Sequence, residues 1–293
     1  NSSRFREVSN LFPQQFNYHV APYVKNFVDW LNLSCGPAFD AFSNSMRTLI
    51  LNIDAVLLGV PWWVWIILVT LLAWRLTHNV IKTLLPGVLL FTVGMFGLWS
   101  IAMQTLSVVI VAVLLSLLLG IPAGIAMGVS DRVNAALTPL LDAMQTMPSF
   151  VYLIPAMMLF DLGKVPAIVA TFIYAVPPVQ RLTNLGIRQV SASIQEAAVA
   201  FGATPWQLMR EVRFPLALPS ILAGVNQTTM MALSMVVICA MVAAGGLGEE
   251  VLLAVNRIDV GRGFEAGWAI VVLAIIIDRL SQGSVNKWES PRN

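Results

Sequence analysis

Charged residues are scarce in this sequence. Asp, Glu, Lys and Arg make up 11% of its 293 residues, whereas hydrophobic residues make up 58%. A soluble domain carries about 25% charged residues, so most of the surface of this chain does not face water. The net charge of +2 is too small to indicate a nucleic-acid partner. The composition therefore predicts a membrane protein.

Cysteine and histidine are rarer still, with two of each in the chain. Cys35 lies in the N-terminal region and Cys239 inside an apolar run, and this spacing predicts neither a disulfide framework nor a metal site. His19 and His78 cannot build a metal centre or a proton relay without carboxylates nearby. We therefore expect no catalytic residue and no metal ligand in this chain. The first residues also lack the pattern of a secretory signal, so we expect no cleaved signal peptide.

Long runs without charge are what the sequence does contain. The longest extends from Thr83 to Ser130. A membrane helix needs about 20 apolar residues, so this run predicts two helices with a turn near Gly97–Gln104. The predicted fold class is all-α, a polytopic membrane protein with about seven transmembrane helices. The expected spans are residues 57–76, 80–98, 104–128, 139–160, 165–185, 216–244 and 264–282.

The first 54 residues have an amphipathic pattern instead. In the segment YVKNFVDWLNL, apolar residues recur at helical spacing beside charged ones. The sequence CGP at 35–37 predicts a break, after which a second amphipathic piece begins near Phe39. Helices of this kind lie in the membrane interface. We expect residues 1–54 to be an interfacial lead-in that braces the bundle, and residues 55–98 to hold the first two transmembrane helices.

Lysine and arginine are distributed unequally between the two sides of the predicted bundle. Ten of them fall in the connections and the C-terminal tail on one side, and three fall in the short connections on the other. Because basic residues favour the cytoplasmic side, this asymmetry places the tail, residues 283–293, in the cytoplasm and the N-terminus outside. The external three are Lys164, Arg257 and Arg262, and the cytoplasmic ten are Arg75, Lys82, Arg132, Arg181, Arg188, Arg210, Arg213, Arg279, Lys287 and Arg292.

One polar segment, residues 189–215, interrupts the apolar runs on the cytoplasmic side. Ser193, with Glu196 three residues later, predicts a capping box that starts a helix. That helix is expected to stop near Gly202. Its alanines are small enough to let the surface of another protein approach closely.

A second short helix is predicted directly after the glycine. Thr204 and Gln207 form another capping box, with Pro205 at the first helical position. This helix is expected to end at about Val212, before Pro215 leads into the next span. A helix–turn–helix unit with apolar, aromatic and basic residues suits a partner interface.

This segment resembles the cytoplasmic signature of ABC importer permeases. Glu196-Ala197-Ala198, Gly202, Val212, Phe214 and Pro215 stand in its register, with Val and Phe in place of the commoner Ile and Leu. The sequences LLDAMQTMPSFVYLIPAMMLF, PPVQRLTNLGI and NQTTMMALSMVVICAMVAAGGLG resemble the permease subunits of glycine betaine/proline betaine importers. The resemblance covers residues 100–282 almost continuously.

The resemblance implies a permease core over residues 99–282 that acts as a homodimer in the bacterial inner membrane. It also implies two cytoplasmic ATPase subunits, which would bind ATP and Mg, and an external binding protein that docks near residues 245–263. The chain itself contains no Walker sequence G-x-x-x-x-G-K-[ST], so we expect it to bind no cofactor. The coupling residues implied by the resemblance are Glu196, Ala197, Ala198, Gly202, Thr204, Trp206, Arg210, Val212 and Pro215.

Other classes of protein remain as alternatives. A secondary transporter usually has two similar halves and ionisable residues inside the membrane. No such repeat is visible, and Asp142, Asp161 and Asp278 fall near predicted span ends. A membrane-embedded enzyme lacks candidate residues, whereas an ABC permease for choline, carnitine or an amino acid fits the resemblance. Asp142 and Asp278 have Arg181 and Arg279 among their candidate partners, and the sequence does not choose between the pairings.

The predicted sixth span carries polar side chains. Asn226, Met230 and Ser234 recur at four-residue steps, and Gln227 and Met231 broaden the same face. Polar groups inside a membrane are costly unless they meet water, a ligand or another helix. Hydrogen bonding between helices and lining of a pathway both satisfy this requirement. We predict that this face looks toward the dimer axis and lines the substrate pathway.

Two further patterns have a structural interpretation. The small residues of GIPAGIAMG at 120–128 predict close helix packing. The tryptophans around residues 62–74 are typical of a membrane interface, and this interpretation is preferred to an aromatic cage for a quaternary ammonium group.

Overall fold

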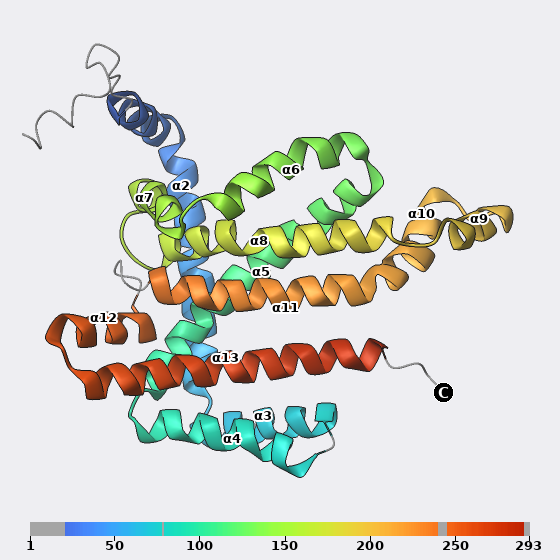
Figure 1. Cartoon of the computed structure of the whole chain (residues 1–293). Helices are drawn as coiled ribbons and strands as arrows, with labels where there is room; N and C mark the ends of the chain where they lie inside the picture. The colour runs from blue at the N-terminus through green and yellow to red at the C-terminus, as the bar shows by residue number, and fades with distance from the viewer. Residues whose placement is uncertain (1–20, 78, 240–244, 290–293) are drawn as a thin grey trace, which may run out of the picture. The chain divides into compact units, whose positions relative to one another are not determined.

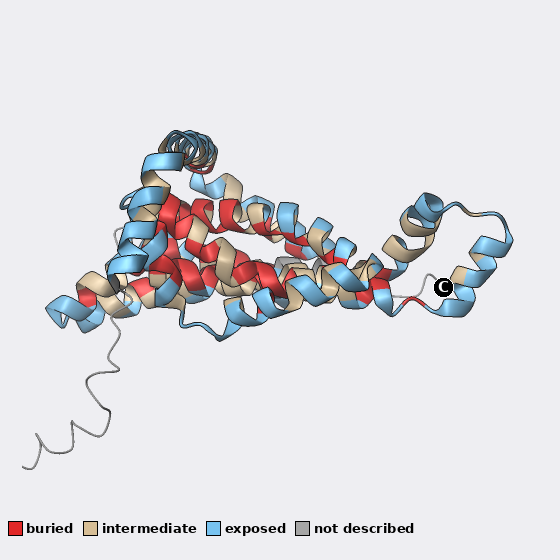
Figure 2. Cartoon of the chain, turned by 90° about the horizontal axis from the view of Figure 1, so that it is seen from above, coloured by how far each residue is buried: buried red, intermediate tan, exposed pale blue. Residues whose placement is uncertain are grey.

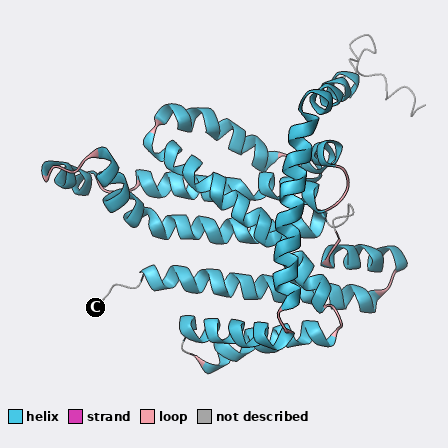
Figure 3. Cartoon of the chain, turned by 180° about the vertical axis from the view of Figure 1, so that it is seen from behind, coloured by secondary structure: helices cyan, strands magenta, loops and turns pink. Residues whose placement is uncertain are grey.

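The structure, a computed structural model, describes residues 21–77, 79–239 and 245–289. Within these ranges every regular element is helical, as Figure 3 shows, so the predicted all-α class is confirmed. The chain divides into two compact units, residues 1–42 and 43–293. The described part of the first unit is the beginning of helix α2 (Ala21–Gly59), and the second unit holds the helical bundle.

Helix α2 is continuous across the predicted break. It passes through Gly36 and Pro37, so the expectation of two separate amphipathic pieces is wrong. A proline inside a helix removes one N–H donor, but the bonds on either side of it hold the helix together. After Gly59 the chain turns by 92° into the next helix.

The bundle contains long helices that cross it and shorter ones at its two ends. The end that carries α9 is called the α9 end, and the opposite end, which carries α12, is called the α12 end. The helices are α3 (Trp62–Thr77), α4 (Val80–Met95), α5 (Trp99–Val129), α6 (Asp131–Thr146), α7 (Ser149–Phe160), α8 (Lys164–Arg188), α9 (Ala192–Ala200), α10 (Pro205–Gln207), the π-helix η2 (Leu208–Arg213), α11 (Phe214–Cys239), α12 (Leu247–Arg257) and α13 (Val260–Glu289).

The long helices lie side by side. Figure 1 shows α6, α8, α11 and α13 in that order, with the α3–α4 pair beyond α13. Helix α5 lies behind α8 and α11 in this view and packs against both. Helix α7 packs on the first part of α8, and no helix lies in front of the rest of α8 and α11 in this view.

The number of membrane spans differs from the predicted seven. Among the described residues, four helices are long and apolar enough to cross a membrane, and the number rises to 6 if each of two bent helix pairs counts as one span. Helix α4, with 16 residues, is shorter than a full span. The count of seven is thus not confirmed, although the predicted turn near Gly97 is: α4 ends at Met95 and α5 begins at Trp99.

The predicted span 139–160 is not one helix. Helices α6 and α7 meet at an angle of 101° around Met147 and Pro148. Proline disfavours the helical conformation of the residue before it, and Met147 is extended, with φ −73° and ψ 138°. The hydroxyl of Tyr152 on α7 donates to the carbonyl oxygens of Met144 and Met147, which ties the two arms together.

Glycines allow α5 to approach α8 closely. A Cβ atom placed on Gly124 would lie 2.6 Å from Cβ of Thr183 and 2.7 Å from the carbonyl oxygen of Gln180. Gly120 and Gly128, one turn away on either side, face α8 in the same way. The predicted close packing of the 120–128 segment is therefore confirmed.

An ion pair joins the second-unit part of α2 to the start of α8. Nζ of Lys164 lies 2.8 Å from Oδ2 of Asp54, and the two side chains are only 29% and 13% exposed. Most of the pair is thus withdrawn from solvent, and each charge offsets the desolvation cost of the other.

Helix α12 is held to the bundle by its first residue. The N–H of Leu247 donates to Oγ1 of Thr105 on α5, at 2.9 Å. Gly246, which precedes it, has φ +83° and no room for a side chain against Thr105. Arg262, beyond the next turn, forms an ion pair with Glu250 at 2.5 Å.

Candidate functional site

The α9–α10 segment forms a protrusion at one end of the bundle. Figure 2 shows it as an extension made of exposed and intermediate residues, beyond the buried middle of the helices. None of the residues of α9, α10 or η2 is buried. This chain therefore supplies no packing partner for most of the segment.

The start of α9 differs from the prediction. The helix begins at Ala192, its N-cap residue is Ser191, and no side chain caps its backbone. Ser193 lies inside the first turn, with its Oγ 2.7 Å from Oγ of Ser191. The predicted capping box of Ser193 and Glu196 is therefore wrong, because the helix starts before Ser193. The carboxylate of Glu196 is exposed and accepts no hydrogen bond from the described residues.

Gln195 fixes α9 against η2. Its Nε2 donates to the carbonyl oxygen of Val190 at 2.7 Å. Its Oε1 accepts from Nε and Nη2 of Arg213, at 2.9 and 2.6 Å. Both residues are missing from the predicted coupling set, and nothing in their spacing along the sequence indicates this contact.

The turn between the two short helices is built on a glycine, as predicted. Gly202 has φ +87°, a conformation that favours glycine. Its N–H donates to the carbonyl oxygen of Val199, and the N–H of Ala203 donates to that of Ala198. These two bonds form a Schellman-type helix end.

The second predicted capping box is present. Oγ1 of Thr204 accepts from the N–H of Gln207 at 3.3 Å, and the side chain of Gln207 accepts from the N–H of Thr204 at 2.8 Å. The helix that follows does not end near Val212, however. It continues through η2 into α11, so that residues 205–239 form one unbroken helical stretch. Pro215 has no N–H to donate and its ring crowds the preceding turn, which the wider π-helical turn accommodates.

Exposed apolar side chains gather on this protrusion. Phe201 is 93% exposed and Trp206 is 70% exposed. Phe201 lines a hollow of about 330 Å³, and exposed large apolar side chains beside such a hollow are typical of an interaction site. Phe201 is missing from the predicted set, although an aromatic residue next to a helix-ending glycine in a polar segment is a usable signal. The hollow is lined by Ala198, Phe201, Gly202, Ala203, Gln207, Glu211 and Val212.

The nine predicted coupling residues all belong to this protrusion or to its junction with α11. Ala198 and Val212 are half-buried, and the other seven are exposed. All nine thus belong to one segment whose side chains are at most half-buried, and their role in coupling stays a prediction. The seven are Glu196, Ala197, Gly202, Thr204, Trp206, Arg210 and Pro215.

The predicted pathway residues lie on the side of α11 that does not pack on α8. Gln227 and Ser234 are exposed, and Met230 and Asn226 are half-buried. Oγ of Ser234 donates to the carbonyl oxygen of Met230 within its own helix, at 3.1 Å. Oδ1 of Asn226 is buried and accepts no hydrogen bond within the described part of the chain. A buried amide oxygen without a donor needs water, a ligand or a second chain.

Two side-chain ion pairs link α6 to α8. Arg181 pairs with Asp142, which resolves the alternatives left open by the sequence for that carboxylate. Arg188 pairs with Asp131 at 2.7 Å and also donates to the carbonyl oxygen of Met127.

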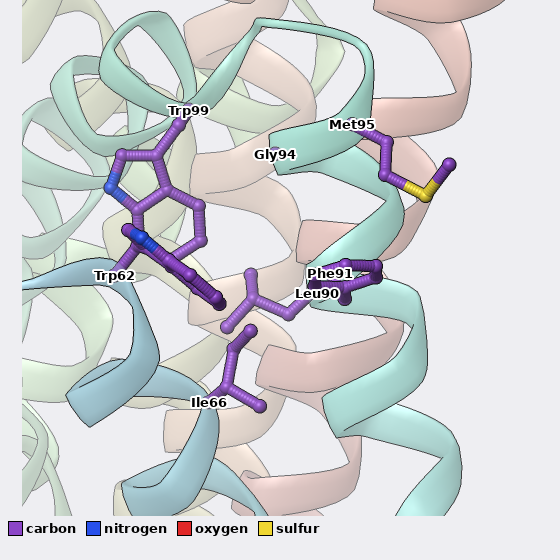
Figure 4. Close-up of a pocket in the computed structure, with 7 residues that line it drawn as sticks. All are labelled: Trp62, Ile66, Leu90, Phe91, Gly94, Met95 and Trp99. Atoms are coloured by element: carbon purple, nitrogen blue, oxygen red, sulfur yellow. The ribbon is translucent and has the colours of Figure 1, made fainter.

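A cavity of about 370 Å³ lies between α3, α4 and the start of α5 (Figure 4). Its lining contains no charged side chain, so it suits hydrocarbon rather than a charged or zwitterionic solute. Across the described residues, no group of three or more His, Cys, Asp or Glu is placed to hold a metal ion. The cavity is lined by Trp62, Ile66, Leu90, Phe91, Gly94, Met95 and Trp99.

Comparisons with known proteins agree on one family. The profile of the "Binding-protein-dependent transport system inner membrane component" family matches residues 116–286. The glycine betaine/proline betaine transport system permease protein of Escherichia coli (strain K12) is 46% identical over 260 residues, which cover 89% of this chain and 73% of that protein. The glycine betaine transport system permease protein of Bacillus subtilis (strain 168) is 43% identical over 275 residues, covering 94% and 97%.

Two further similarities point the same way. The glycine betaine/carnitine transport permease protein of Listeria monocytogenes serotype 1/2a (strain 10403S) is 44% identical over 281 residues, covering 92% of this chain and 97% of that protein. A solved structure of the MetNI methionine ABC transporter in an inward-facing conformation matches with a TM-score of 0.60 and 21% identity, covering 67% of this chain and 98% of that chain. At that identity the structural match bears on the fold alone.

Proposed function

Because this chain belongs to the family of binding-protein-dependent transport system inner membrane components, we propose that it forms the membrane pathway of an ATP-driven importer for a quaternary ammonium osmoprotectant. Two copies of the chain would enclose the pathway. Two ATPase subunits, which would hold ATP and Mg, would bind the cytoplasmic side, and a binding protein would deliver the solute from outside. Family membership makes the chain a multi-pass transport component and not an enzyme.

The names of the relatives support glycine betaine or proline betaine as the solute. The three relatives at 43–46% identity are named for glycine betaine, alone or with proline betaine or carnitine. A choline transport permease of Bacillus subtilis (strain 168) is 34% identical and covers 47% of this chain. Choline and carnitine are thus the second candidates.

The observation that carries the proposed coupling role is the uncovered α9–α10 protrusion. Phe201 and Trp206 are too exposed to stabilise this chain by burial. The hollow beside Ala198 would hold a side chain of another protein. Burial of such aromatic residues commonly supplies most of the binding free energy of a protein–protein interface. Because α10 continues through η2 into α11 without a break, a push on the protrusion would reach the proposed pathway face of α11 directly.

The α12 end is the proposed docking face for the binding protein. Val255, Ile258 and Val260 are exposed there, beside the Arg262–Glu250 ion pair. Apolar residues rimmed by charges suit a protein partner. This assignment requires the α9 end to lie in the cytoplasm, as the distribution of basic residues indicates.

Topology is tested by cysteine labelling in intact cells. We expect Asn256→Cys to react with an impermeant thiol reagent added outside, and Ala203→Cys to react only after the membrane is opened. External labelling of Ala203→Cys would overturn the proposed orientation and the coupling role with it.

Coupling is tested in the reconstituted complex with Ala198→Trp, whose matched control is Ala200→Trp on the opposite side of the same helix. Trp at 198 would fill the hollow, so we expect loss of the ATPase subunits or ATP hydrolysis that no longer responds to loaded binding protein. The control should keep both. Wild-type retention and stimulation in Ala198→Trp and in Gly202→Asp would show that the protrusion is not the coupling element.

A further inference from the structure

Polar contacts, more than apolar packing, join α6 to α8. Among the described side chains of α6, Leu141 is the buried one. The pairs Asp131–Arg188 and Asn134–Asn184 lie at 2.7 and 2.8 Å, and Asp142 pairs with Arg181 farther along. The Asp131–Arg188 and Asp142–Arg181 pairs both carry full charges, but they lie at different positions along α8.

Arg181 lies inside α8, a helix long and apolar enough to cross a membrane, and not in the cytoplasmic connection to which the distribution of basic residues assigned it. It precedes the end of α8 at Arg188 by seven residues, which is about 10 Å along the helix axis. Charged groups at such depth do not face lipid; they face other protein or a water-filled path. Yet the side chains of Arg181 and Asp142 are 41% and 56% exposed in the single chain. The pair therefore faces a space that this chain does not fill.

That space is continuous with the uncovered face of α11. The N–H of Val179 donates to Oγ1 of Thr228 at 3.2 Å, which sets α8 and α11 in register. Arg181 and Gln227 lie two residues and one residue from this bond, so they are at the same depth. Helices α6, α8 and α11 lie side by side with α5 behind (Figure 1). Gln227 is exposed and the ion pair is partly exposed, so the other helices of this chain do not cover them.

The guanidinium of Arg181 also has an unused donor. Its Nη2 donates to Oδ1 of Asp142, but its Nε is buried and has no partner among the described residues. Nε and Nη2 together form the edge that binds a carboxylate through two parallel hydrogen bonds. Asp142 is bonded to Nη2 alone, so the guanidinium keeps a hydrogen-bond donor that a carboxylate in the place of Asp142 could use.

We propose that Arg181 and Asp142 are a recognition pair for a zwitterionic solute in the membrane pathway. The carboxylate of the solute replaces Asp142 on Arg181, and its quaternary ammonium group, which has no N–H, is attracted to the released Asp142 by charge alone. The exchange leaves every charge paired before and after binding. A cation without a carboxylate would leave Arg181 unpaired, so the pair favours betaines over choline. The inference rests on the proposed import function.

The test is glycine betaine uptake into proteoliposomes by the complete complex, with binding-protein-stimulated ATP hydrolysis measured in parallel. The variant is Asp142→Asn with Arg181→Gln, which keeps a neutral hydrogen bond between α6 and α8. The matched control is Asp131→Asn with Arg188→Gln, which neutralises the pair between the same helices at their α9 end. We expect the first variant to lose uptake about tenfold or more while it retains stimulated hydrolysis, since it removes both charges that the solute is proposed to engage. The control should stay within about twofold of wild type.

Each outcome decides the inference. Wild-type uptake in the first variant overturns it, and so does an equal loss in the control, because the pairs would then only hold α6 to α8. If the double variant does not assemble, the single variant Asp142→Asn is tested instead. Asparagine can still accept a hydrogen bond from Arg181 but carries no charge. Undiminished glycine betaine uptake by Asp142→Asn overturns the inference. Failure of the wild-type complex to take up glycine betaine would instead refute the proposed function.

Discussion

Replacing Gly124 with alanine tests how tightly α5 packs on α8. The new Cβ would lie 2.7 Å from the carbonyl oxygen of Gln180 and 2.6 Å from Cβ of Thr183, whereas ordinary contact begins at 3.4 Å. Neither neighbour is the end of a flexible side chain, so the two helices must separate locally by about 0.8 Å. A shift of this size forfeits a quarter to a half of the dispersion energy of the contacts involved.

The expected cost is set by two opposing effects. An extra methyl group in a packed core costs about 1–3 kcal/mol, whereas alanine in place of glycine inside a helix contributes about 1 kcal/mol in its favour. Gly267→Ala in α13 is the matched control, because a Cβ there meets nothing within 4 Å. The helix term is common to both variants, so Gly124→Ala should be less stable than Gly267→Ala by about 1–3 kcal/mol.

Thermal unfolding of the purified chain, followed by the fluorescence of its nine tryptophans, measures this difference. We expect a lower midpoint for Gly124→Ala than for wild type, and an equal or higher midpoint for Gly267→Ala. Equal midpoints for the two variants would refute the close approach of α5 and α8.

Three further changes have defined outcomes. Thr204→Ala removes the cap of α10 and should cost that segment about 1 kcal/mol, seen as faster loss of ATPase subunits from the purified complex; unchanged retention would show that the cap does not support docking. Lys164→Met leaves Asp54 largely buried without its counter-ion and should lower stability by about 3 kcal/mol, with recovery on adding Asp54→Leu; no recovery would mean that the pair is not the cause. Asn226→Leu should reduce solute uptake more than it reduces the yield of the complex, and equal losses would indicate a packing role instead.

Several features could be predicted from residues that are close together in the sequence. The scarcity of charge predicts a membrane protein because a lipid-facing surface admits few ions. The box of Thr204 and Gln207 and the turn at Gly202 were predicted correctly, because capping and positive φ involve residues within a few positions of one another. The close packing at 120–128 follows from the absence of side chains on its glycines.

Local signals failed where two signals of similar strength competed. The sequence CGP resembles a helix break, yet α2 continues, because one lost hydrogen bond does not outweigh the many that a helix of 39 residues retains. Ser191 and Ser193 are both suitable N-cap residues, and Ser191 is the N-cap of α9, which begins at Ala192. Pro215 resembles a helix start, but the π-helical turn of η2 carries the chain through it.

Contacts between distant residues were decided only by the tertiary structure. The sequence alone determined that this chain is a helical membrane protein with a capped polar segment between two apolar runs, because composition, periodicity and capping are local properties. The sequence left several partners open for Asp142; the packing of α6 beside α8 selected Arg181. Other contacts depend in the same way on which helices are neighbours and at what register. Examples are the hydrogen bonds that Arg213 donates to Gln195, the exposure of Phe201, and the shared depth of Arg181 and Gln227. Neighbours and register are set by side-chain packing across the bundle, which no stretch of sequence specifies by itself.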